Sequence, residues 1–527
     1  MKADVTLVPR VEIAPMSWAE LRQEISRQLG LVVGQALGVE NQHGEFSHRL
    51  QRHRGSLTGL LVAILSTLLL LCMFIVGELP ASPDQGIIVQ TGDQVEAIVA
   101  RSPAGTRFTL QPGTHRLQAP IVPKDGDVFL GEPGATLSGA EVLTHFRKES
   151  GYWVTSVRVR PQSSPRGKCH PSHPACTLPE DLFIDGTPRM RAAKLAEVSP
   201  GKWFLDYDTG TVYLGDNPAG RTAEISLVPH AISGSAADVR IEGLTIERYA
   251  SGAGEGAVDG RAGRGGWIVK NNEIRQNHGA GIRLGQRMQV LDNKIHDNGQ
   301  LGITGSGAGI LIEGNEIARN NYAGYLYFWE AGGVKITWSR DVTVRQNDVH
   351  DNEGPGIWGD LENENVVYEQ NHTKGNKEAG IFHEVSYRAV IRSNTIEEDG
   401  SDAEGRDSPW FGAGIIVSGS SDVEVYGNHV VNCLNGIVGQ QPDRTSDRTG
   451  SPYLLRNLYV HDNDVSQTDG IAAGIVRSQR ADDSVFTSRN NRFLNNHYQL
   501  RSPSKPTFIW QNARWTLSEW KGRFRWN

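Results

Sequence analysis

Asp360 and Glu384 are the two side chains whose type and spacing could do chemistry together. Each ends a similar five-residue string, which reads GIWGD at 356–360 and GIFHE at 380–384. Two carboxyl groups held close together repel as anions, so the pKa of one of them rises. One can then attack as an anion while the other donates a proton. The two groups meet only if the elements that carry them stack with a shift of 24 residues (384 − 360).

A repeated phrase between residues 239 and 500 supplies such elements. It reads apolar-x-apolar-x-x-Asn-x-apolar-x-x-Asn, with a base period of 21 to 24 residues and longer steps where loops are inserted. Its first Asn falls at 272, 293, 315, 347, 371, 394, 428, 463 and 491. A second Asn recurs at 277, 298, 320, 352, 376 and 496, and Gly-Ile at 281–282, 302–303, 356–357, 380–381, 414–415, 436–437 and 470–471. Such self-similarity predicts a solenoid of stacked repeats.

The repeat is typical of β-strands and not of helices. Its apolar residues alternate with period two, as at Val342 and Val344, and β-branched residues and Gly dominate it. With one repeat per coil, each recurring position becomes a column with a spacing of about 4.8 Å. An Asn column can chain its side-chain amides along the axis, because each amide both donates and accepts. We therefore expect an all-β, parallel β-helix.

The carboxylate pair occupies one such column. Asp360 lies 13 residues after Asn347 (360 − 347), and Glu384 lies 13 residues after Asn371 (384 − 371). If the isoleucines of the two Gly-Ile pairs point inward, alternation turns the following aromatic residue and the carboxylate outward. The two backbones then stand about 5 Å apart, which is close to the carboxyl separation of about 5 to 5.5 Å in retaining glycoside hydrolases.

Longer strings in this region resemble a known family. The segments GIWGD (356–360), FHEVSY (382–387) and VIRSNTI (390–396) are similar to the paired-carboxylate segment of β-helical retaining glycoside hydrolases, the β-xylosidase family especially. The repeat as a whole resembles the right-handed parallel β-helix of the pectin lyase-like superfamily. The resemblance implies that Asp360 is the nucleophile and Glu384 the acid/base, and that a small β insertion interrupts the helix. This chain departs from the family pattern at Leu361 and Tyr387.

The neighbouring side chains supply candidate substrate-binding residues, and no cofactor or metal site is predicted. Aromatic rings offer apolar faces to a sugar ring, and polar side chains beside the long insertions line the expected cleft. The candidates are Trp329, Glu330, Lys335, Trp338, Trp358, Phe382 and Tyr387.

Three alternatives remain open at this point. Asp360 and Glu384 could be ordinary solvated strand residues. The chain could be a polysaccharide lyase or a C5-epimerase acting on uronate polymers, with its base and cations among His350, Lys335, His383, Tyr387 and Arg388. Against this, the Asp-Pro-His-Glu signature of the epimerases and an acidic calcium cluster are absent from the sequence. The chain could also be a non-catalytic glycan-binding or envelope structural protein.

The order of segments follows from where the repeat starts, breaks and ends. Between 141 and 230 the period is lost, and short strands around turns predict antiparallel hairpins. Trp510, Trp515, Trp520 and Trp526 are expected to cover the last coil. The predicted segments are a cytoplasmic region (1–55), a transmembrane helix (56–78), a linker (79–87), opening coils (88–140), a small β insertion (141–230), parallel β-helix repeats (231–500) and a C-terminal cap (501–527).

The stretch from Leu57 to Val76 contains no charged residue and is long enough to cross a bilayer core of about 30 Å. A signal peptide is disfavoured because a region of more than 50 residues precedes the stretch and no small-x-small cleavage site follows it directly. Arg49, Arg52 and Arg54 precede the stretch, which predicts a cytoplasmic N-terminus. The β-helix is then periplasmic or extracellular.

The cysteines and the charge balance bear on partners. Cys169 and Cys176 stand in KCHPSHPAC (168–176), where a disulfide is favoured over a zinc site because the segment is predicted to be extracytoplasmic. The chain has 53 Lys and Arg against 60 Asp and Glu, a formal net charge of -7, which argues against a nucleic-acid partner. The expected partners are a polysaccharide or oligosaccharide, and a lipid bilayer through residues 57–76.

Overall fold

The computed structural model describes residues 86–159, 166–401, 411–466, 468 and 470–523. The predicted cytoplasmic region and transmembrane helix lie outside these residues, as does Trp526. None of the helices in the described ranges has the length and apolar character that a membrane crossing requires. Strands dominate the described part, and most of them belong to three long sheets, here named A, B and C.

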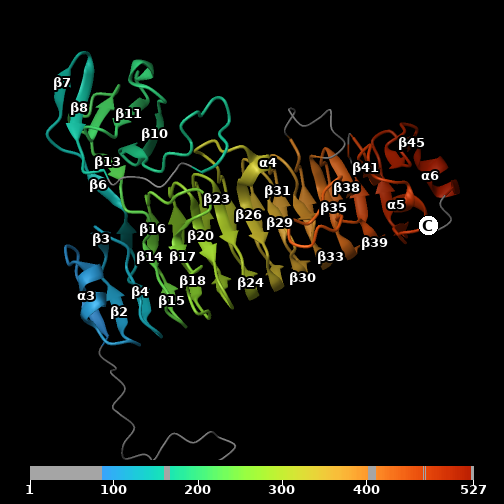
Figure 1. Cartoon of the computed structure of the whole chain (residues 1–527), viewed down its shortest axis with the longest axis horizontal. Helices are drawn as coiled ribbons and strands as arrows, with labels where there is room; N and C mark the ends of the chain where they lie inside the picture. The colour runs from blue at the N-terminus through green and yellow to red at the C-terminus, as the bar shows by residue number, and fades with distance from the viewer. Residues whose placement is uncertain (1–85, 160–165, 402–410, 467, 469, 524–527) are drawn as a thin grey trace, which may run out of the picture. The chain divides into compact units, whose positions relative to one another are not determined.

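The strands of each sheet come from successive coils, so that neighbours in a sheet are one repeat apart in the sequence (Figure 1). Sheet A consists of β1 (Ile87–Val89), β2 (Arg107–Leu110), β4 (Val128–Gly131), β15 (Arg240–Glu242), β18 (Ile268–Lys270), β21 (Gln289–Leu291), β24 (Ala308–Glu313), β27 (Arg340–Arg345), β30 (Glu364–Glu369), β33 (Tyr387–Arg392), β36 (Ser421–Tyr426), β39 (Arg456–His461) and β42 (Arg492–Leu494). Sheet B consists of β3 (Gly113–Arg116), β5 (Ala135–Ser138), β16 (Thr245–Glu247), β19 (Glu273–Arg275), β22 (Lys294–His296), β25 (Glu316–Ala318), β28 (Asp348–His350), β31 (His372–Lys374), β34 (Thr395–Glu397), β37 (His429–Val431), β40 (Asp464–Ser466) and β43 (His497–Gln499).

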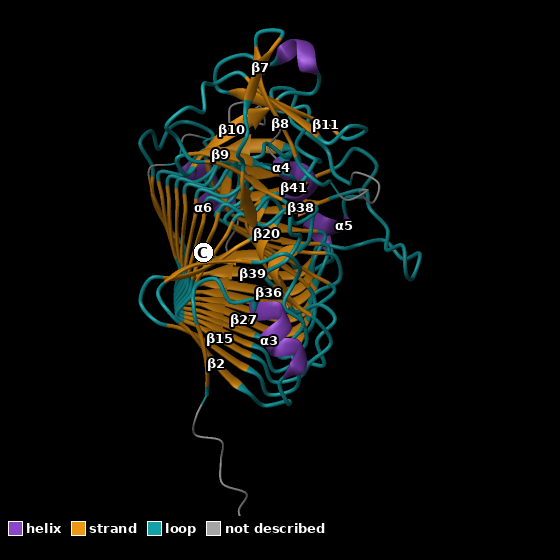
Figure 2. Cartoon of the chain, turned by 90° about the vertical axis from the view of Figure 1, so that its left-hand side faces the viewer, coloured by secondary structure: helices purple, strands orange, loops and turns teal. Residues whose placement is uncertain are grey.

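Sheet C carries the carboxylate pair. It consists of β14 (Ile232–Ser233), β17 (Gly256–Asp259), β20 (Ala280–Leu284), β23 (Leu301–Gly305), β26 (Gly332–Thr337), β29 (Ile357–Asp360), β32 (Ile381–Glu384), β35 (Ala413–Ser418), β38 (Asn435–Gln441), β41 (Ala473–Arg477), β44 (Phe508–Trp510) and β45 (Ala513–Trp515). Only the last pair, β44 with β45, is antiparallel; the other pairs within the three sheets are parallel. The strands of successive coils lie behind one another in Figure 2, so the chain is the parallel β-helix that the repeat predicted.

The core lies between the three sheets and runs through the coils as one cluster. Its sheet C column is in register from coil to coil and contains Ile282, Ile303, Val334, Ile357, Ile381, Ile415 and Ile437. Each of these side chains is at most 1% exposed. Because alternate residues of a strand face opposite sides, this inward column places the residues beside it on the outer face of sheet C.

Two ladders of Asn side chains hold the turns of successive coils together. In the first ladder, Oδ1 of Asn347 accepts the backbone N–H of Asn315 at 3.0 Å and its side-chain amide at 2.9 Å. The amide of Asn347 then donates to Oδ1 of Asn371 at 2.9 Å and to the carbonyl of Ile312 at 3.0 Å. The residue before each ladder Asn is left-handed, as at Gln346 (φ 55°), which explains why Gly sits there in some coils.

The register predicted for the last coils was wrong. Asn463 donates to Asn496, not to Asn491, so Asn496 continues the first ladder and Asn491 precedes β42. Likewise, Ala473 pairs with Ile437, and Ile471 lies two residues ahead of the column in which it was expected. The insertion that contains α5 (Ser484–Thr487) lies between β41 and β42, so it accounts for the shift at Asn491 but not for the one at Ile471.

Replacing Asn347 by Leu should destabilise the β-helix by at least about 1 to 3 kcal/mol, because buried donors and acceptors of two neighbouring coils would lose their partners. The measurement is the free energy of unfolding in denaturant. Gln346→Leu is the matched control, since Gln346 is the exposed neighbour on the same turn. Equal unfolding transitions for the two variants would contradict a role of the ladder in stability.

The break in the repeat contains an eight-stranded sheet, mostly antiparallel, beside the first coils (Figure 1). Its strands are β6 (Ala140–Val142), β7 (Arg147–Glu149), β8 (Tyr152–Ser156), β9 (Leu182–Ile184), β10 (Thr187–Arg191), β11 (Lys202–Asp206), β12 (Thr211–Leu214) and β13 (Ala223–Ser226), with the 3₁₀ turn η1 (Leu195–Glu197). This sheet has its own small core around Trp203. Cys169 and Cys176 form a disulfide in the loop that leads back to β9.

The two ends of the described coils are covered by apolar side chains. α3 (Val95–Arg101) places Val95, Ile98 and Val99 against the first coils. At the other end, α6 (Leu517–Arg523) contributes Trp520, which stacks on Phe508 with ring centroids 5.0 Å apart. Covering both ends removes the open core that a stack of coils would otherwise expose.

Candidate active site

Asp360 and Glu384 lie on neighbouring strands of sheet C, at the ends of β29 and β32. Ile357 pairs with Ile381, and the register continues through the two following residues of each strand. The isoleucines point into the core, so the outer face carries Trp358, Asp360, Phe382 and Glu384. The backbones of the two carboxylates are therefore one interstrand distance apart, about 4.8 Å.

Gly359 stands between Trp358 and Asp360 because the core leaves no room for a side chain there. A Cβ at Gly359 would lie 2.1 Å from the hydroxyl oxygen of Tyr368, a fully buried residue of β30. Tyr368 in turn lies 3.2 Å from Nδ1 of His383, the inward neighbour of Glu384. The inner face of these two strands is thus tightly packed, which fixes the positions of the two carboxylates on the outer face.

Lys335, on β26, neutralises Asp360. Its Nζ lies 3.0 Å from Oδ2 of Asp360, and the two side chains are 3% and 7% exposed. The ammonium group also lies 3.5 Å from the centre of the Trp358 ring, a cation–π contact, and donates to the carbonyl of Trp329 at 3.4 Å. Oδ1 of Asp360 accepts no hydrogen bond from any described residue. Lys335 therefore holds one carboxylate oxygen and leaves the other unengaged.

Glu384 has the properties of a proton donor. Burial, together with the nearby charge of Asp360, raises the pKa of Glu384 to about 7. Three contacts oppose this rise: an ion pair with Arg444 at 2.5 Å, the charge of Lys335, and the indole N–H of Trp358, which donates to Oε2 at 3.2 Å. A carboxyl group with a pKa near neutrality can exchange a proton in either direction at physiological pH.

A hollow of about 390 Å³ opens beside Glu384. Trp358 and Phe382 form its floor as a stacked pair, with ring centroids 5.6 Å apart and planes 3° from parallel. Asp360 is not among the lining residues. The lining consists of Tyr327, Phe328, Pro355, Trp358, Glu378, Phe382, Glu384, Phe411, Ser418, Gln440 and Pro442. An aromatic floor beside carboxyl groups suits the apolar face and the hydroxyl groups of a sugar ring.

The hollow holds a second buried carboxyl group, which the sequence did not single out. Burial raises the pKa of Glu378 to about 7, with a further contribution from Glu384, and backbone N–H groups of Ala379 and Gly412 oppose the rise. The N–H of Ala379 donates to Oε2 at 2.8 Å. Glu378 is thus the rival of Glu384 for any proton transfer in this hollow.

Arg444, Ser418 and Gln440 were also missed. Ser418 and Gln440 continue the column of Glu384 on the next two coils, so counting along the repeat could have found them. Arg444 comes from a loop between β38 and β39, where no period exists to follow.

Four of the proposed substrate-binding residues lie elsewhere. Trp329 and Glu330, in α4 (Tyr327–Glu330), face Arg166: its guanidinium lies 5.9 Å from the Trp329 ring and 3.8 Å from the Glu330 carboxylate. Trp338 and Tyr387 line a different hollow, of about 520 Å³, over sheet A. They were misplaced because Trp338 follows the last residue of β26 and Tyr387 begins β33, where the chain turns from sheet C into sheet A.

The residues proposed as base or cation for a lyase or epimerase are scattered. His383 points into the core, and burial lowers its pKa to about 3. His350, on sheet B, contacts Asp351, and Arg388, on sheet A, binds Glu364. Lys335 alone of this set reaches the carboxylate pair, because the others lie on sheets A and B or on the inner face. In the described ranges, no group of three or more His, Cys, Asp or Glu side chains could hold a metal ion.

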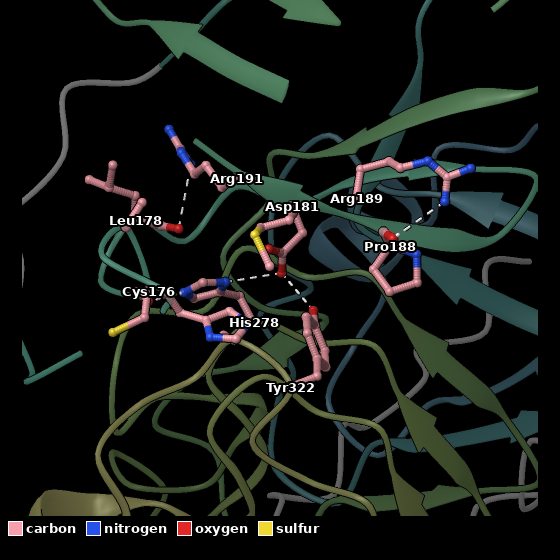
Figure 3. Close-up of a pocket in the computed structure, with 12 residues that line it drawn as sticks. Cys176, Leu178, Asp181, Pro188, Arg189, Arg191, His278 and Tyr322 are labelled. Carbon is pink, nitrogen blue, oxygen red and sulfur yellow. Dashed lines mark hydrogen bonds and ion pairs between the residues drawn. The ribbon is translucent and has the colours of Figure 1, made fainter. Parts of the chain in front are cut away.

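A smaller hollow, of about 180 Å³, lies where the inserted sheet meets the coils (Figure 3). His278 contacts Asp181 at 3.0 Å through Nδ1 and the carbonyl of Cys176 at 2.8 Å through Nε2. The hydroxyl of Tyr325 also lies 3.2 Å from Nε2. Although burial opposes it, Asp181 raises the pKa of His278. The hydroxyl of Tyr322 donates to the same Asp181 carboxylate at 2.6 Å. These groups satisfy one another, so the cluster ties the insertion to the coils.

Comparison with known proteins agrees with the fold. Residues 258–429 match the family model of the right handed beta helix region. No curated protein is significantly similar in sequence to the chain. The solved complex of XylC with xylose is 14% identical, with a TM-score of 0.55 over 77% of this chain and 79% of that chain.

Two further solved structures match with lower TM-scores. A glycoside hydrolase is 10% identical, with a TM-score of 0.42 over 75% of this chain and 88% of that chain. The A-module of the Azotobacter vinelandii mannuronan C-5 epimerase AlgE4 is 12% identical, with a TM-score of 0.43 over 75% and 87%. At 14% identity, the likeness to the XylC complex shows the fold alone. The stacked parallel coils show that the chain is a parallel β-helix protein, and residues 258–429 within them are similar to the right handed beta helix region.

Proposed function

We propose that this chain is a retaining glycoside hydrolase in which Asp360 is the nucleophile and Glu384 the acid/base. The main support for the proposal is that the carboxyl groups of Asp360 and Glu384 have different surroundings. Asp360 is bound by the Lys335 ammonium, whereas burial and the charge of Asp360 raise the pKa of Glu384 to about 7. Two carboxyl groups on neighbouring strands, with backbones about 5 Å apart and such different environments, suit the retaining mechanism.

In the first step Asp360 attacks the anomeric carbon of the sugar, and Glu384 protonates the departing glycosidic oxygen. We assign the attack to Oδ1 of Asp360, because Lys335 holds Oδ2. In the second step Glu384, now ionised, takes a proton from water as the water attacks the glycosyl ester. Asp360 is only 7% exposed, so the sugar must displace the atoms that cover it before the first step.

The lyase or epimerase alternative has less support in the geometry. It needs a base, and also a cation that neutralises a uronate carboxylate at the same point of the cleft. His383 faces the core, and Tyr387 and Arg388 lie over sheet A. Lys335 is committed to Asp360. The non-catalytic alternative does not account for a buried carboxylate oxygen without a partner beside a carboxyl group of raised pKa.

Product analysis separates these functions. The full-length chain would be incubated with aryl glycosides, xylo-oligosaccharides and uronate polymers; the xylosides are included because a xylose complex shares the fold. We expect release of the aryl group or of reducing ends without ultraviolet absorption by the product. An unsaturated, ultraviolet-absorbing product would show a lyase. Isomerisation of the uronate residues without cleavage of the polymer would show an epimerase. Binding without any product would leave only a glycan-binding protein.

We further propose that residues 57–76 anchor the chain in a membrane, with residues 1–55 in the cytoplasm and the β-helix outside it, because three arginines flank the N-terminal side of the apolar stretch. Protease added to intact cells, or to cells with a permeabilised outer envelope, should digest the β-helix and spare an N-terminal tag. Full protection of the β-helix under both conditions would contradict this orientation.

A further inference from the structure

A cavity of about 1120 Å³ lies between the inserted sheet and the coils, on the same side of the molecule as the carboxylate pair. One of its lining residues, Arg283, stands on the outer face of sheet C. It pairs in register with Thr304, and Thr304 with Lys335, so Arg283 lies two coils from the lysine that binds Asp360. At about 4.8 Å per coil, the two backbones are about 10 Å apart along the axis.

Arg283 is a half-buried cation without a partner. No hydrogen bond or ion pair from any described residue reaches its guanidinium, whereas other arginines of the coils are paired, as Arg392 is with Glu369. Burial, together with the charges of Arg261 and Arg166, lowers the pKa of Arg283, while Asp259 and Glu255 oppose this shift. Five N–H donors in a planar fork fit the two oxygens of a carboxylate or of a sulfate ester.

The cavity as a whole has an excess of cations. Five arginines line it against three glutamates, and one of these glutamates, Glu180, is bound by Arg191 at 3.1 Å. Arg116 is bound by Glu224 at 2.6 Å, but the acid–base contacts of two other lining arginines are long: Arg261 lies 3.8 Å from Asp259, and Arg166 lies 3.8 Å from Glu330. An anionic ligand could therefore bind without breaking a strong ion pair.

α4 separates this cavity from the hollow at the carboxylate pair. Tyr327 and Phe328 line that hollow, while Trp329 and Glu330 contact Arg166 at the cavity. A ligand that occupies both must cross the short helix, which a single sugar cannot do and an oligomer can.

We propose that the cavity around Arg283 is a subsite for an acidic group of the glycan that is cut at Asp360 and Glu384. The substrate is then an acidic oligosaccharide or polysaccharide, with a carboxylate or a sulfate on a sugar some units away from the bond that breaks. This inference rests on the hydrolase function proposed above for the site itself. It adds the substrate class, and it makes the inserted sheet one wall of the substrate site.

The test measures binding apart from turnover. An Asp360→Asn background prevents cleavage, and calorimetry then compares uronate oligosaccharides with their carboxyl-reduced forms and sulfated oligosaccharides with their desulfated forms. Arg283→Gln should weaken binding of one acidic ligand about tenfold or more and leave its neutral counterpart unchanged. Arg107→Gln is the matched control, because Arg107 is an exposed arginine of sheet A and its loss changes the net charge equally.

Which acidic ligand responds identifies the group: the uronates for a carboxylate, the sulfated series for a sulfate. An Arg283→Gln effect equal on acidic and neutral ligands, an equal effect of Arg107→Gln, or no effect at all would overturn the subsite. Suppose that Arg283→Gln weakens only the binding of acidic ligands, but the parent chain cleaves no glycoside. This result would support the acidic subsite and overturn the proposed hydrolase function. If the parent chain cleaves neutral glycosides but has no affinity for acidic ones, the hydrolase function would be supported and the acidic subsite overturned.

Discussion

Asp360→Asn is expected to reduce kcat on every glycoside that the parent chain hydrolyses, by on the order of 10⁴-fold, which is the typical scale when a covalent nucleophile is removed. The amide is nearly isosteric with the carboxylate but cannot form the glycosyl ester. The measurement is steady-state turnover, with substrate binding followed separately. Asp348→Asn, at an exposed position of sheet B, is the control and should leave kcat unchanged.

Asp360 forms a buried ion pair with Lys335, so Asp360→Asn affects stability as well as catalysis. A second variant at Lys335 can separate the two effects. Removing one member of a buried ion pair leaves the other charge uncompensated and costs about 3 to 5 kcal/mol. Asp360→Asn alone should therefore also lower the melting temperature, whereas Lys335→Met with Asp360→Asn should restore much of it. If the stable double variant regained activity, the loss in the single variant would be a folding defect and Asp360 would not be the nucleophile.

The regular part of the fold could be predicted because the spacing of the repeated residues fixes which residues pair on neighbouring coils. From Asn272 to Asn463 the first ladder connects the asparagines that the period selected, with each amide bonded to the next. The prediction failed at Asn491 because the insertion with α5 carries no periodic signal, and an Asn stands both before and after β42. Spacing locates a strand only while the chain adds no residues between coils.

The same reasoning explains what could be foreseen of the site. β29 and β32 lie on consecutive coils of regular length, so alternation alone placed two carboxylates and two aromatic rings on one face. Lys335 belongs to the neighbouring strand of the same sheet and was also found. Trp338 and Tyr387 sit at turns, where alternation stops, and Arg444 approaches from a loop. Glu378 was overlooked because it precedes its strand, outside the alternating residues.

Glu384→Ala should act selectively, because a proton donor matters only when the leaving group needs a proton. Hydrolysis of natural oligosaccharides should fall by about 10² to 10⁴-fold, while a substrate with a dinitrophenolate leaving group should still form the glycosyl ester on Asp360. Added azide should then accelerate turnover and give a glycosyl azide of retained configuration, since an anion can enter where Glu384 no longer stands. Glu378→Ala is the comparison, because this carboxyl group lines the same hollow with a similar pKa.

The pH dependence of kcat/KM tests the same residue without removing it. Because the protonated form of Glu384 is the acid, activity should fall as the pH rises through about 7. Arg444 stabilises the ionised form through its ion pair, so Arg444→Met should raise the pKa of Glu384 and move this limb to higher pH. Azide rescue in Glu384→Ala but not in Glu378→Ala, together with this shift, assigns the proton to Glu384. Rescue in Glu378→Ala alone would transfer the role to Glu378, and an inverted first product would exclude the retaining mechanism for both.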